Sequence, residues 1–493
     1  MNAASGNNLL IVVSDEHRKD TMGCIGHPFV RTPNLDGLAA RGTVFENAYT
    51  PSPICVPARA AMACGDYVHN IGCWDSATPY RGAPRSWMHH LRDCGIEVTS
   101  IGKLHFRSSE DDNGLSREML PMHVAGGVGW PVGLLREDPP RFDAARELAA
   151  DVGAGTSSYT DYDLEITEAA CDWLLARRAS ETPWATFVSL VSPHYPLVAP
   201  SKFYDLYDPE AVDFPVAYEH WQRPRHAELN NIARFFDYDR HFDRRRVREA
   251  RAAYYGLVSF MDDCVGRILS ALDQSGQADN TVVVYVSDHG DMMGDHGLWT
   301  KQVMYEASAG IPMIAAGPGF PVGKRVGTGT SLVDLAATAI DVTNVVGHMD
   351  ESFPGRSLRM IARERDDPNR TVFSEYHDGG STTGAFMVRW ENWKFVHYVG
   401  HDAQLFDLAQ DPHELHDLAL DGVNDPAILA AWREGERRLR AICDPEEVNA
   451  RCFADQGRRI AELGGFEACR SAYAFNHTPA PGEWRALEEC SES

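Results

Sequence analysis

The chain has 493 residues, of which 44% are hydrophobic and 24% charged, a composition typical of globular proteins. A chain of this length buries roughly three quarters of its unfolded surface, so its core needs no disulfide staples. The 71 acidic residues outnumber the 46 basic residues and give a net charge of −25. This charge argues against a nucleic-acid partner and against an anionic membrane surface, because both bind basic patches.

The early apolar segment and the cysteines bear on the cellular compartment. The longest early apolar run, residues 9–13, is too short for the apolar region of a signal peptide or for a membrane-spanning helix. Eleven cysteines are scattered from Cys24 to Cys490 without the spacing of a disulfide framework. Such cysteines are typical of buried free thiols in a reducing compartment. We therefore expect a cytoplasmic protein with no membrane attachment.

Four strand-like apolar runs each end in a cluster of polar or charged residues. Near-continuous apolar strands are typical of a parallel sheet that is buried on both faces. A helical spacing of apolar residues over 249–272 indicates that helices lie between the strands. We therefore predict an α/β fold, with a large doubly wound, mostly parallel sheet flanked by helices. The four runs are residues 9–13, 96–101, 185–191 and 281–286.

The polar clusters predict where the functional site lies. In open α/β sheets, ligands bind outside the carboxyl ends of the strands. The four clusters follow the strands at those ends, so we expect their side chains to meet at one edge of the sheet. The clusters are Ser14-Asp15-Glu16, Gly102-Lys103-Leu104-His105, Ser192-Pro193-His194 and Ser287-Asp288-His289.

Near residue 365 the pattern changes to that of an antiparallel sheet. Residues 363–370 form a charged, proline-containing stretch that is typical of a linker. Two strand-like runs, 386–390 and 393–398, flank two residues in the pattern of a β-hairpin, and 405–408 predicts a further short strand. We predict a catalytic domain over residues 1–364 and a smaller antiparallel-sheet domain with a tail over 365–493. We expect a homo-oligomer in which this tail can reach another subunit.

The most specific local motif is Cys55-Val56-Pro57-Ala58-Arg59. A Cys-x-Pro-x-Arg motif is expected ~0.06 times by chance in a chain of this composition. Pro57 suits the first turn of a helix, and a nucleophile at Cys55 would then lie at the positive end of that helix, which favours anions. On the pentapeptide alone, a buried free cysteine beside an ordinary helix start is the alternative.

Together with Thr32-Pro33-Asn34-Leu35-Asp36, this motif resembles the signature of the formylglycine-dependent type I sulfatases of the alkaline phosphatase superfamily. Gly102-Lys103-Leu104-His105-Phe106 is similar to the second motif of that family, and Ser287-Asp288-His289-Gly290-Asp291 to its late metal motif. The matches run in order from about residue 9 to residue 418, and 405–408 resembles the C-terminal domain of the family. Residues 287–301 are especially similar to choline sulfatases.

The resemblance implies a covalent mechanism at Cys55. In this family a separate maturation enzyme oxidises the motif cysteine to formylglycine, whose hydrated aldehyde carries two hydroxyls on one carbon. One hydroxyl attacks sulfur and displaces the alcohol, and the other loses a proton to expel sulfate and restore the aldehyde. The resemblance therefore implies a sulfuric ester hydrolase that acts on a small sulfate monoester.

The resemblance also implies that one divalent cation lies beside the modified Cys55. Asp15, Asp288 and His289 would be its ligands, with Glu16 as a candidate fourth ligand. One hydroxyl of the modified Cys55 would also bind it. Oxygen-rich ligands favour Ca²⁺, and the imidazole keeps Mn²⁺ open. Many sulfatases have paired aspartates after the first strand and asparagine after the late aspartate, where this chain has Glu16 and His289. Whether Glu16 is a ligand therefore stays open.

Five further residues acquire roles from the resemblance. Arg59 would orient the formylglycine and the cation, and Lys103 would bridge a sulfate oxygen and the nucleophile. His105 would take the proton when the aldehyde is regenerated. His194 and Lys301 would flank the leaving oxygen, one of them as general acid, and the sequence does not decide which. If the segment after residue 101 stays extended, Lys103 and His105 face the same side.

Three alternatives remain beside the sulfatase interpretation. Phosphonate monoester or phosphodiester hydrolases of the same superfamily also use formylglycine, but they typically lack the Lys and His of the second motif, so Lys103 and His105 favour sulfate. A two-zinc phosphatase does not explain Pro57 and Arg59. The third alternative is a non-catalytic binding protein in which Cys55 is never oxidised.

Overall fold

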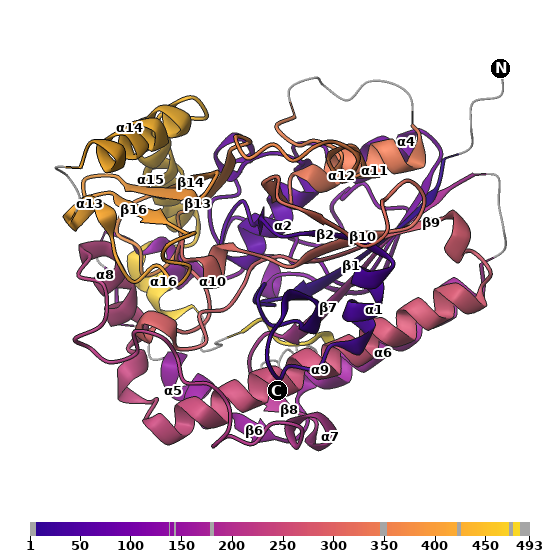
Figure 1. Cartoon of the computed structure of the whole chain (residues 1–493), viewed down its shortest axis with the longest axis horizontal. Coiled ribbons are helices and arrows are strands. Elements are labelled where there is room, and N and C mark those ends of the chain that lie inside the picture. Colours follow the sequence, from indigo (N-terminus) through magenta and orange to yellow (C-terminus); the bar gives the residue numbers. More distant parts are fainter. Residues whose placement is uncertain are drawn as a thin grey trace.

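The computed structural model of the chain describes residues 6–137, 139–141, 144–177, 182–345, 353–421, 425–472 and 477–483. An eight-stranded sheet lies at the centre of this part of the chain (Figure 1). In order across the sheet, its strands are β11 (Lys324–Val326), β2 (Gly42–Phe45), β10 (Met313–Ala316), β9 (Thr281–Ser287), β1 (Asn8–Asp15), β7 (Trp184–Pro193), β4 (Glu97–Lys103) and β5 (Arg117–Met122). β10 runs antiparallel to both neighbours, and the other neighbouring strands pair in parallel. The predicted large, mostly parallel sheet is confirmed.

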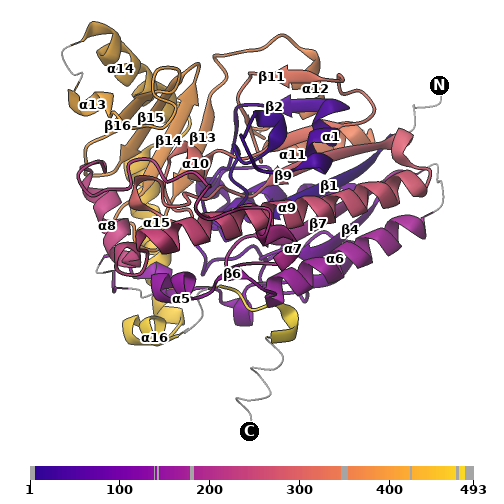
Figure 2. The same ribbon diagram turned by 60° about the horizontal axis from the view of Figure 1, so that its bottom comes forward.

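Helices cover both faces of this sheet (Figure 2), and β1 shows why its sequence is continuously apolar. Successive side chains of a strand point to opposite faces. Leu10 and Val12 join the core on one face, whereas Leu9, Ile11 and Val13 join the core on the other, and all five are buried. The first core includes α1 (Pro33–Ala40), α6 (Ser158–Leu175) and α9 (Arg244–Gln274), and the second includes α2 (Cys55–Cys64), α4 (Trp87–Asp93), α11 (Asp334–Thr343) and α12 (Leu358–Arg363).

The helix predicted over residues 249–272 is confirmed as α9 and is longer than expected. It begins after Asp243, whose side chain accepts a hydrogen bond from the backbone N–H of Arg246 and so caps the first turn. That first turn is basic rather than apolar, so the apolar spacing does not mark it. Gly276 lies just beyond the helix with a φ of 72°, a conformation that favours glycine after a helix end.

The C-terminal sheet is antiparallel, as predicted. Its strands, in spatial order, are β13 (Val372–Tyr376), β14 (Ala385–Trp390), β15 (Trp393–Tyr398) and β16 (Gln404–Asp407). Trp390 pairs with Trp393, which confirms the two-residue hairpin, and the first hairpin residue, Glu391, has a φ of 46°. The helices α14 (Pro426–Arg440) and α15 (Pro445–Glu462) pack beside this sheet (Figure 1). The domain boundary after residue 364 stays a prediction.

None of the described helices combines the length and apolar character needed to cross a bilayer.

Short strands and helices complete the described chain. The short strands pair as β12 (Thr330–Ser331) with β3 (Ala48–Tyr49) and β6 (Val152–Ala154) with β8 (Leu197–Ala199), and the remaining α-helices are α3 (Val68–Ile71), α5 (Ala144–Ala150), α7 (Ser201–Tyr204), α8 (Ala227–Phe236), α10 (Glu306–Ala309), α13 (Leu418–Asp421) and α16 (Phe466–Ser471).

Candidate active site

The carboxyl ends of β1, β4, β7 and β9 meet at one edge of the sheet, as the positions of the polar clusters predicted. Ser14 of β1 lies opposite Ser287 of β9, and Asp15 of β1 lies opposite Pro193 of β7. β4 pairs with the other side of β7. The parallel pairing therefore places the acidic, basic and imidazole side chains that follow these strands side by side.

Helix α2 delivers Cys55 to this edge. The helix begins at Cys55 after an extended residue, Ile54, so the sulfur lies at the helix end whose free N–H groups favour anions. Pro57 is in the first turn, where its missing N–H costs no hydrogen bond. All ten residues of α2 are buried, and the turn that ends it uses Gly65 at a φ of 70°. The predicted helix start over the sheet edge is confirmed.

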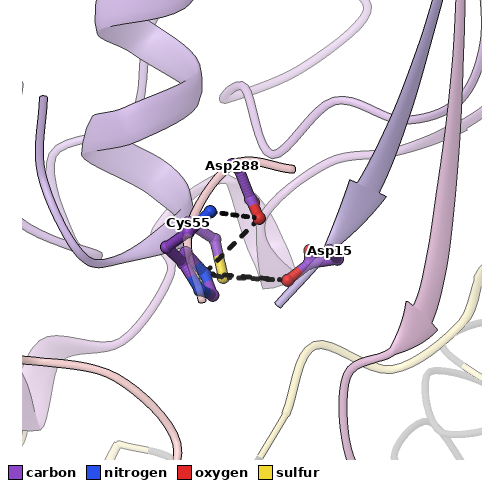
Figure 3. Close-up of side chains that lie close together, drawn as sticks. Asp15, Cys55 and Asp288 are labelled. Atoms are coloured by element: carbon purple, nitrogen blue, oxygen red, sulfur yellow. Dashed lines mark hydrogen bonds and ion pairs between the residues drawn. The ribbon is translucent and has the colours of Figure 1, made fainter. Parts of the chain in front are cut away.

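Cys55 lies within a buried group of possible metal ligands (Figure 3). Its Sγ is 3.0 Å from Nε2 of His289 and 3.6 Å from Oδ1 of Asp15, and the same His289 nitrogen is 3.6 Å from Oδ1 of Asp288. These four residues offer ligand atoms that all lie within 4.8 Å of one another. Buried carboxylates need compensating charge, and two of them with one imidazole form a donor set that suits a divalent cation.

Arg59, one turn after Cys55 on α2, ties the strand ends together. Its Nε donates to Oδ2 of Asp288 over 2.8 Å, and one terminal nitrogen donates to Oδ2 of Asp15 over 3.1 Å. The other terminal nitrogen donates to the backbone oxygen of Lys103 over 2.9 Å and to the Ser189 hydroxyl over 2.8 Å. Ser189 had no signal in the sequence, because it lies inside a strand rather than at its end.

Lys103 and Arg59 supply positive charge to Asp15. The Lys103 ammonium forms a close ion pair with Asp15, and both side chains are fully buried. Burial alone would raise the pKa of Asp15, but Lys103, His194 and Arg59 outweigh it and hold that pKa well below its usual value. Asp15 is therefore ionised at neutral pH and able to act as a metal ligand.

Glu16 points to a second group of side chains. Its φ of 68° turns the chain away from the line of β1, and its carboxylate accepts a hydrogen bond from Lys301 Nζ over 2.9 Å and lies 3.2 Å from Nε2 of His194. Glu16 and His194 form a second possible ligand group with Asp15. That Glu16 binds the same cation as Asp288 and His289 stays a prediction.

A pocket opens beside Cys55 and receives the predicted catalytic groups His105, His194 and Lys301. His105 does not continue an extended segment, since its φ of 54° turns the chain directly after β4. Its imidazole nevertheless faces the pocket, and neither ring nitrogen has a hydrogen-bond partner among the described residues. Burial and the neighbouring Lys103 hold the pKa of His105 well below its usual value, so the ring is neutral and keeps a free lone pair on one nitrogen.

The pocket also has an aromatic wall that the sequence did not reveal. Tryptophans in a large protein are most often core residues. Trp74 is buried in the core, whereas Trp130 packs against the core and also lines the pocket. Phe236 and Tyr238 are neighbours that stack on each other, but Trp130 and Tyr195 come from other loops, so no local spacing connects the wall residues. They are Trp130, Tyr195, Phe236 and Tyr238, and Ser76, Gln302, His477 and Thr478 add polar atoms to the lining.

The chain belongs to the sulfatase family, a class of sulfuric ester hydrolases. Residues 7–345 match the family model described as Sulfatase, and residues 294–434 match the N-sulphoglucosamine sulphohydrolase, C-terminal model. The choline-sulfatase of Rhizobium meliloti (strain 1021) is 33% identical and covers 96% of this chain and 93% of its own length. An arylsulfatase of Clostridium perfringens is 29% identical, covering 83% of this chain and 90% of its own.

Solved structures share the fold of this chain. The phosphonate monoester hydrolase of Agrobacterium radiobacter superimposes with a TM-score of 0.70 and 22% identity, covering 88% of this chain and 95% of its own. A protein solved with its substrate D-glucosamine-2-N,6-O-disulfate superimposes with a TM-score of 0.69 and 20% identity, covering 90% and 99%. The predicted sulfatase membership and the predicted α/β fold with a smaller antiparallel sheet are both confirmed.

Proposed function

We propose that this chain hydrolyses a small sulfate monoester to an alcohol and sulfate, with Cys55 oxidised to formylglycine by a maturation enzyme. The observation that carries the proposal is the position of Cys55 at the start of α2. Its sulfur contacts Asp15 and His289, and Arg59 on the next turn bonds Asp15 and Asp288. The oxidised residue would supply two hydroxyls on one carbon, one to attack sulfur and one to release sulfate.

One divalent cation fits the donor set beside Cys55, and we propose Ca²⁺, with Mn²⁺ as the alternative. Asp15, Asp288 and His289 would hold it. Burial lowers the pKa of His289 to about 4, so its imidazole is neutral and has a lone pair for a metal. The cation would supply positive charge beside the transferring sulfate. Asp15 also stays bonded to Arg59 and Lys103, which fixes the orientation of this ligand.

Lys301 is the protonated member of the pair that flanks the leaving oxygen. Its ammonium donates to the Glu16 carboxylate over 2.9 Å, and this contact favours the charged form of Lys301 against its burial. Burial and the Lys301 charge hold the pKa of His194 well below its usual value. We therefore infer that Lys301 donates the proton to the alcohol oxygen and that Glu16 orients the Lys301 ammonium. The neutral His194 would accept a hydrogen bond.

Replacement of Lys301 by alanine is expected to slow the hydrolysis of sulfate esters of poorly acidic alcohols by about 10²–10⁴-fold, the contribution typical of a general acid. Esters of acidic phenols need less protonation, so their rates should fall much less. The measurement is kcat against the pKa of the leaving alcohol for a series of sulfate esters. His194→Ala is the matched control, and a steeper dependence in that variant than in Lys301→Ala would assign the acid to His194.

Replacement of His105 by alanine is expected to slow release of sulfate rather than cleavage of the ester. The neutral His105 is placed to take the proton whose loss frees sulfate, so the variant should release one alcohol per active site in a burst and then turn over about 10²–10⁴-fold more slowly. Lys103→Ala should slow the first step by about 10²–10³-fold, without a burst. Rapid-quench measurement of alcohol release separates the two. Unchanged steady-state rates in both variants would remove the main reason to prefer sulfate over phosphonate.

Hydrolysis of phosphonate monoesters or phosphodiesters is the second candidate, because phosphonate monoester hydrolases share the fold. Lys103 and His105 favour sulfate, since both face the site. Rates for an aryl sulfate, choline sulfate and a phosphonate monoester on one preparation test the choice, and a preference for phosphonate would overturn it. A tryptic map of the Cys55 peptide tests the third candidate, a binding protein, because unmodified cysteine throughout would exclude the formylglycine route.

We also propose a cytoplasmic location and assembly into a homo-oligomer. The ten described cysteines are free thiols, which supports a reducing compartment. Size-exclusion chromatography with light scattering tests the assembly.

A further inference from the structure

We propose that Asp378, which follows strand β13 of the C-terminal sheet, is a positioning residue that sets the aromatic wall of the substrate pocket and thereby the preference for bulky leaving groups. Asp378 is fully buried and does not line the pocket itself. The proposal rests on the proposed sulfatase reaction and concerns only the part of the pocket that would hold the alcohol.

Asp378 acts first on Ser76, a lining residue. Its Oδ2 accepts a hydrogen bond from the backbone N–H of Ser76 over 2.8 Å and another from the Ser76 hydroxyl over 2.6 Å. Its Oδ1 accepts from the backbone N–H of Gly379 over 2.7 Å. One carboxylate therefore links a loop of the larger sheet to the end of the C-terminal sheet, and each of its two oxygens is committed to a backbone donor.

Ser76 in turn holds Trp130. The backbone N–H of Trp130 donates to the backbone oxygen of Ser76 over 3.0 Å. The preceding Gly129 packs against the same oxygen so closely that a Cβ there would lie 1.8 Å from it. Ser76, Gly129 and Trp130 all line the pocket. Because Asp378 holds Ser76 and Ser76 holds Trp130, the Asp378 carboxylate sets the position of these three residues in the pocket wall.

The Trp130 ring is confined beside the same carboxylate. A Cβ on Gly133 would lie 2.8 Å from Cε3 of the ring, and a Cβ on Gly379 would lie 2.6 Å from its neighbouring atoms Cζ3 and Cη2. The Gly133 Cβ would also lie 2.1 Å from Oδ1 of Asp378. The ring thus occupies space that two glycines leave free, and Gly379 is held there by Asp378.

The leaving alcohol meets this wall. The pocket that receives Cys55, His105 and Lys301 also has aromatic lining, and none of its described lining residues is acidic. Tyr195 stacks on His194 at the catalytic groups, and Trp130, Phe236 and Tyr238 are the other aromatic residues. Such a surface suits the apolar, aromatic part of an uncharged alcohol, which gains from burial against aromatic rings. A methyl leaving group has no ring to pack against Trp130, so its ester reports mainly on the sulfate end of the site.

The test compares two esters, 4-nitrophenyl sulfate and methyl sulfate, on the full-length enzyme. Asp378→Asn keeps the size of the side chain but replaces one acceptor oxygen by an NH₂ group, which must face either Ser76 or Gly379. We expect kcat/KM for the aryl ester to fall about 10-fold or more, mainly through KM, since an unsatisfied buried donor is costly. For methyl sulfate we expect a change of less than about threefold, because the sulfate end is untouched.

Glu375→Gln is the matched control. Glu375 lies on β13 and is equally buried, but it accepts hydrogen bonds from His69 and His377, away from the pocket wall. It should change both esters alike. Ser76→Ala removes only the hydroxyl and keeps the hydrogen bond from the Ser76 backbone N–H to Asp378. We expect it to lower kcat/KM for the aryl ester alone, by less than Asp378→Asn does. This variant tests the proposal even if Asp378→Asn folds poorly.

Equal losses for both esters in the Asp378 and Ser76 variants would overturn the proposal, because they would show a general effect on folding. A crystal structure of Asp378→Asn with the Trp130 ring unmoved would also overturn it, irrespective of activity. Failure of the proposed function is distinguishable, since the wild-type enzyme would then hydrolyse neither sulfate ester.

Discussion

Replacement of Cys55 by alanine is expected to abolish turnover and leave the fold intact. The proposed nucleophile is a hydroxyl of the oxidised Cys55, and no other side chain at the site can supply two hydroxyls on one carbon. Alanine suits the start of the buried helix α2, and the removed sulfur contacts polar atoms of Asp15 and His289 rather than core side chains. Steady-state sulfate release and thermal unfolding check the two parts, and hydrolysis near the wild-type rate would contradict the mechanism.

Serine at position 55 separates attack from release. A serine hydroxyl can still attack sulfur, but it has no second hydroxyl on the same carbon to expel sulfate. Cys55→Ser should therefore accumulate as a stalled enzyme sulfated at position 55, visible by peptide mass after reaction with an aryl sulfate. Sustained turnover by this variant would count against release through the second hydroxyl.

The strands that carry the site could be predicted because they are buried on both faces. β1, β7 and β9 form near-continuous apolar runs, and β4 carries the β-branched residues typical of a strand. Their polar ends meet because neighbouring parallel strands end at the same edge. The other four strands of the sheet, β2, β5, β10 and β11, were not predicted. β2 and β10 have four residues each, too few for an apolar run to stand out from the surrounding loop. β5 and β11 are edge strands with exposed or half-buried polar residues, so neither forms an apolar run.

Side-chain direction beyond a strand end could not be predicted, because it depends on turn conformation. Glu16 and His105 both have a positive φ, a conformation that neither residue type favours, so the sequence does not predict it. At Glu16 the positive φ directs the side chain towards His194 and Lys301. The contact of Asp378 with Ser76 joins residues 302 positions apart. Only the packing of the C-terminal sheet against the larger sheet brings them together, so a local pattern cannot show it.

Replacement of Asp288 by asparagine is expected to remove the bound cation and the activity together. Oδ2 of Asp288 accepts from Arg59, and Oδ1 accepts from the backbone N–H groups of Glu16 over 3.2 Å and His289 over 3.0 Å. An amide in the same place carries no charge and must present its NH₂ group either to Arg59 or to these backbone donors. The variant therefore loses a charged ligand and also misplaces Arg59, which bonds the remaining carboxylate Asp15.

Elemental analysis of purified protein is the direct measurement for this variant, together with hydrolysis of an aryl sulfate. We expect one calcium or manganese per wild-type chain, much less than one in Asp288→Asn, and a loss of turnover of at least about 10²-fold. Asp334→Asn is the matched control, because Asp334 is equally buried and paired with Arg370 but lies on α11, away from the site. It should keep its cation even if it unfolds at a lower temperature. Normal metal content with full activity in Asp288→Asn would place the cation elsewhere. Two zinc ions per wild-type chain would favour the two-zinc phosphatase alternative.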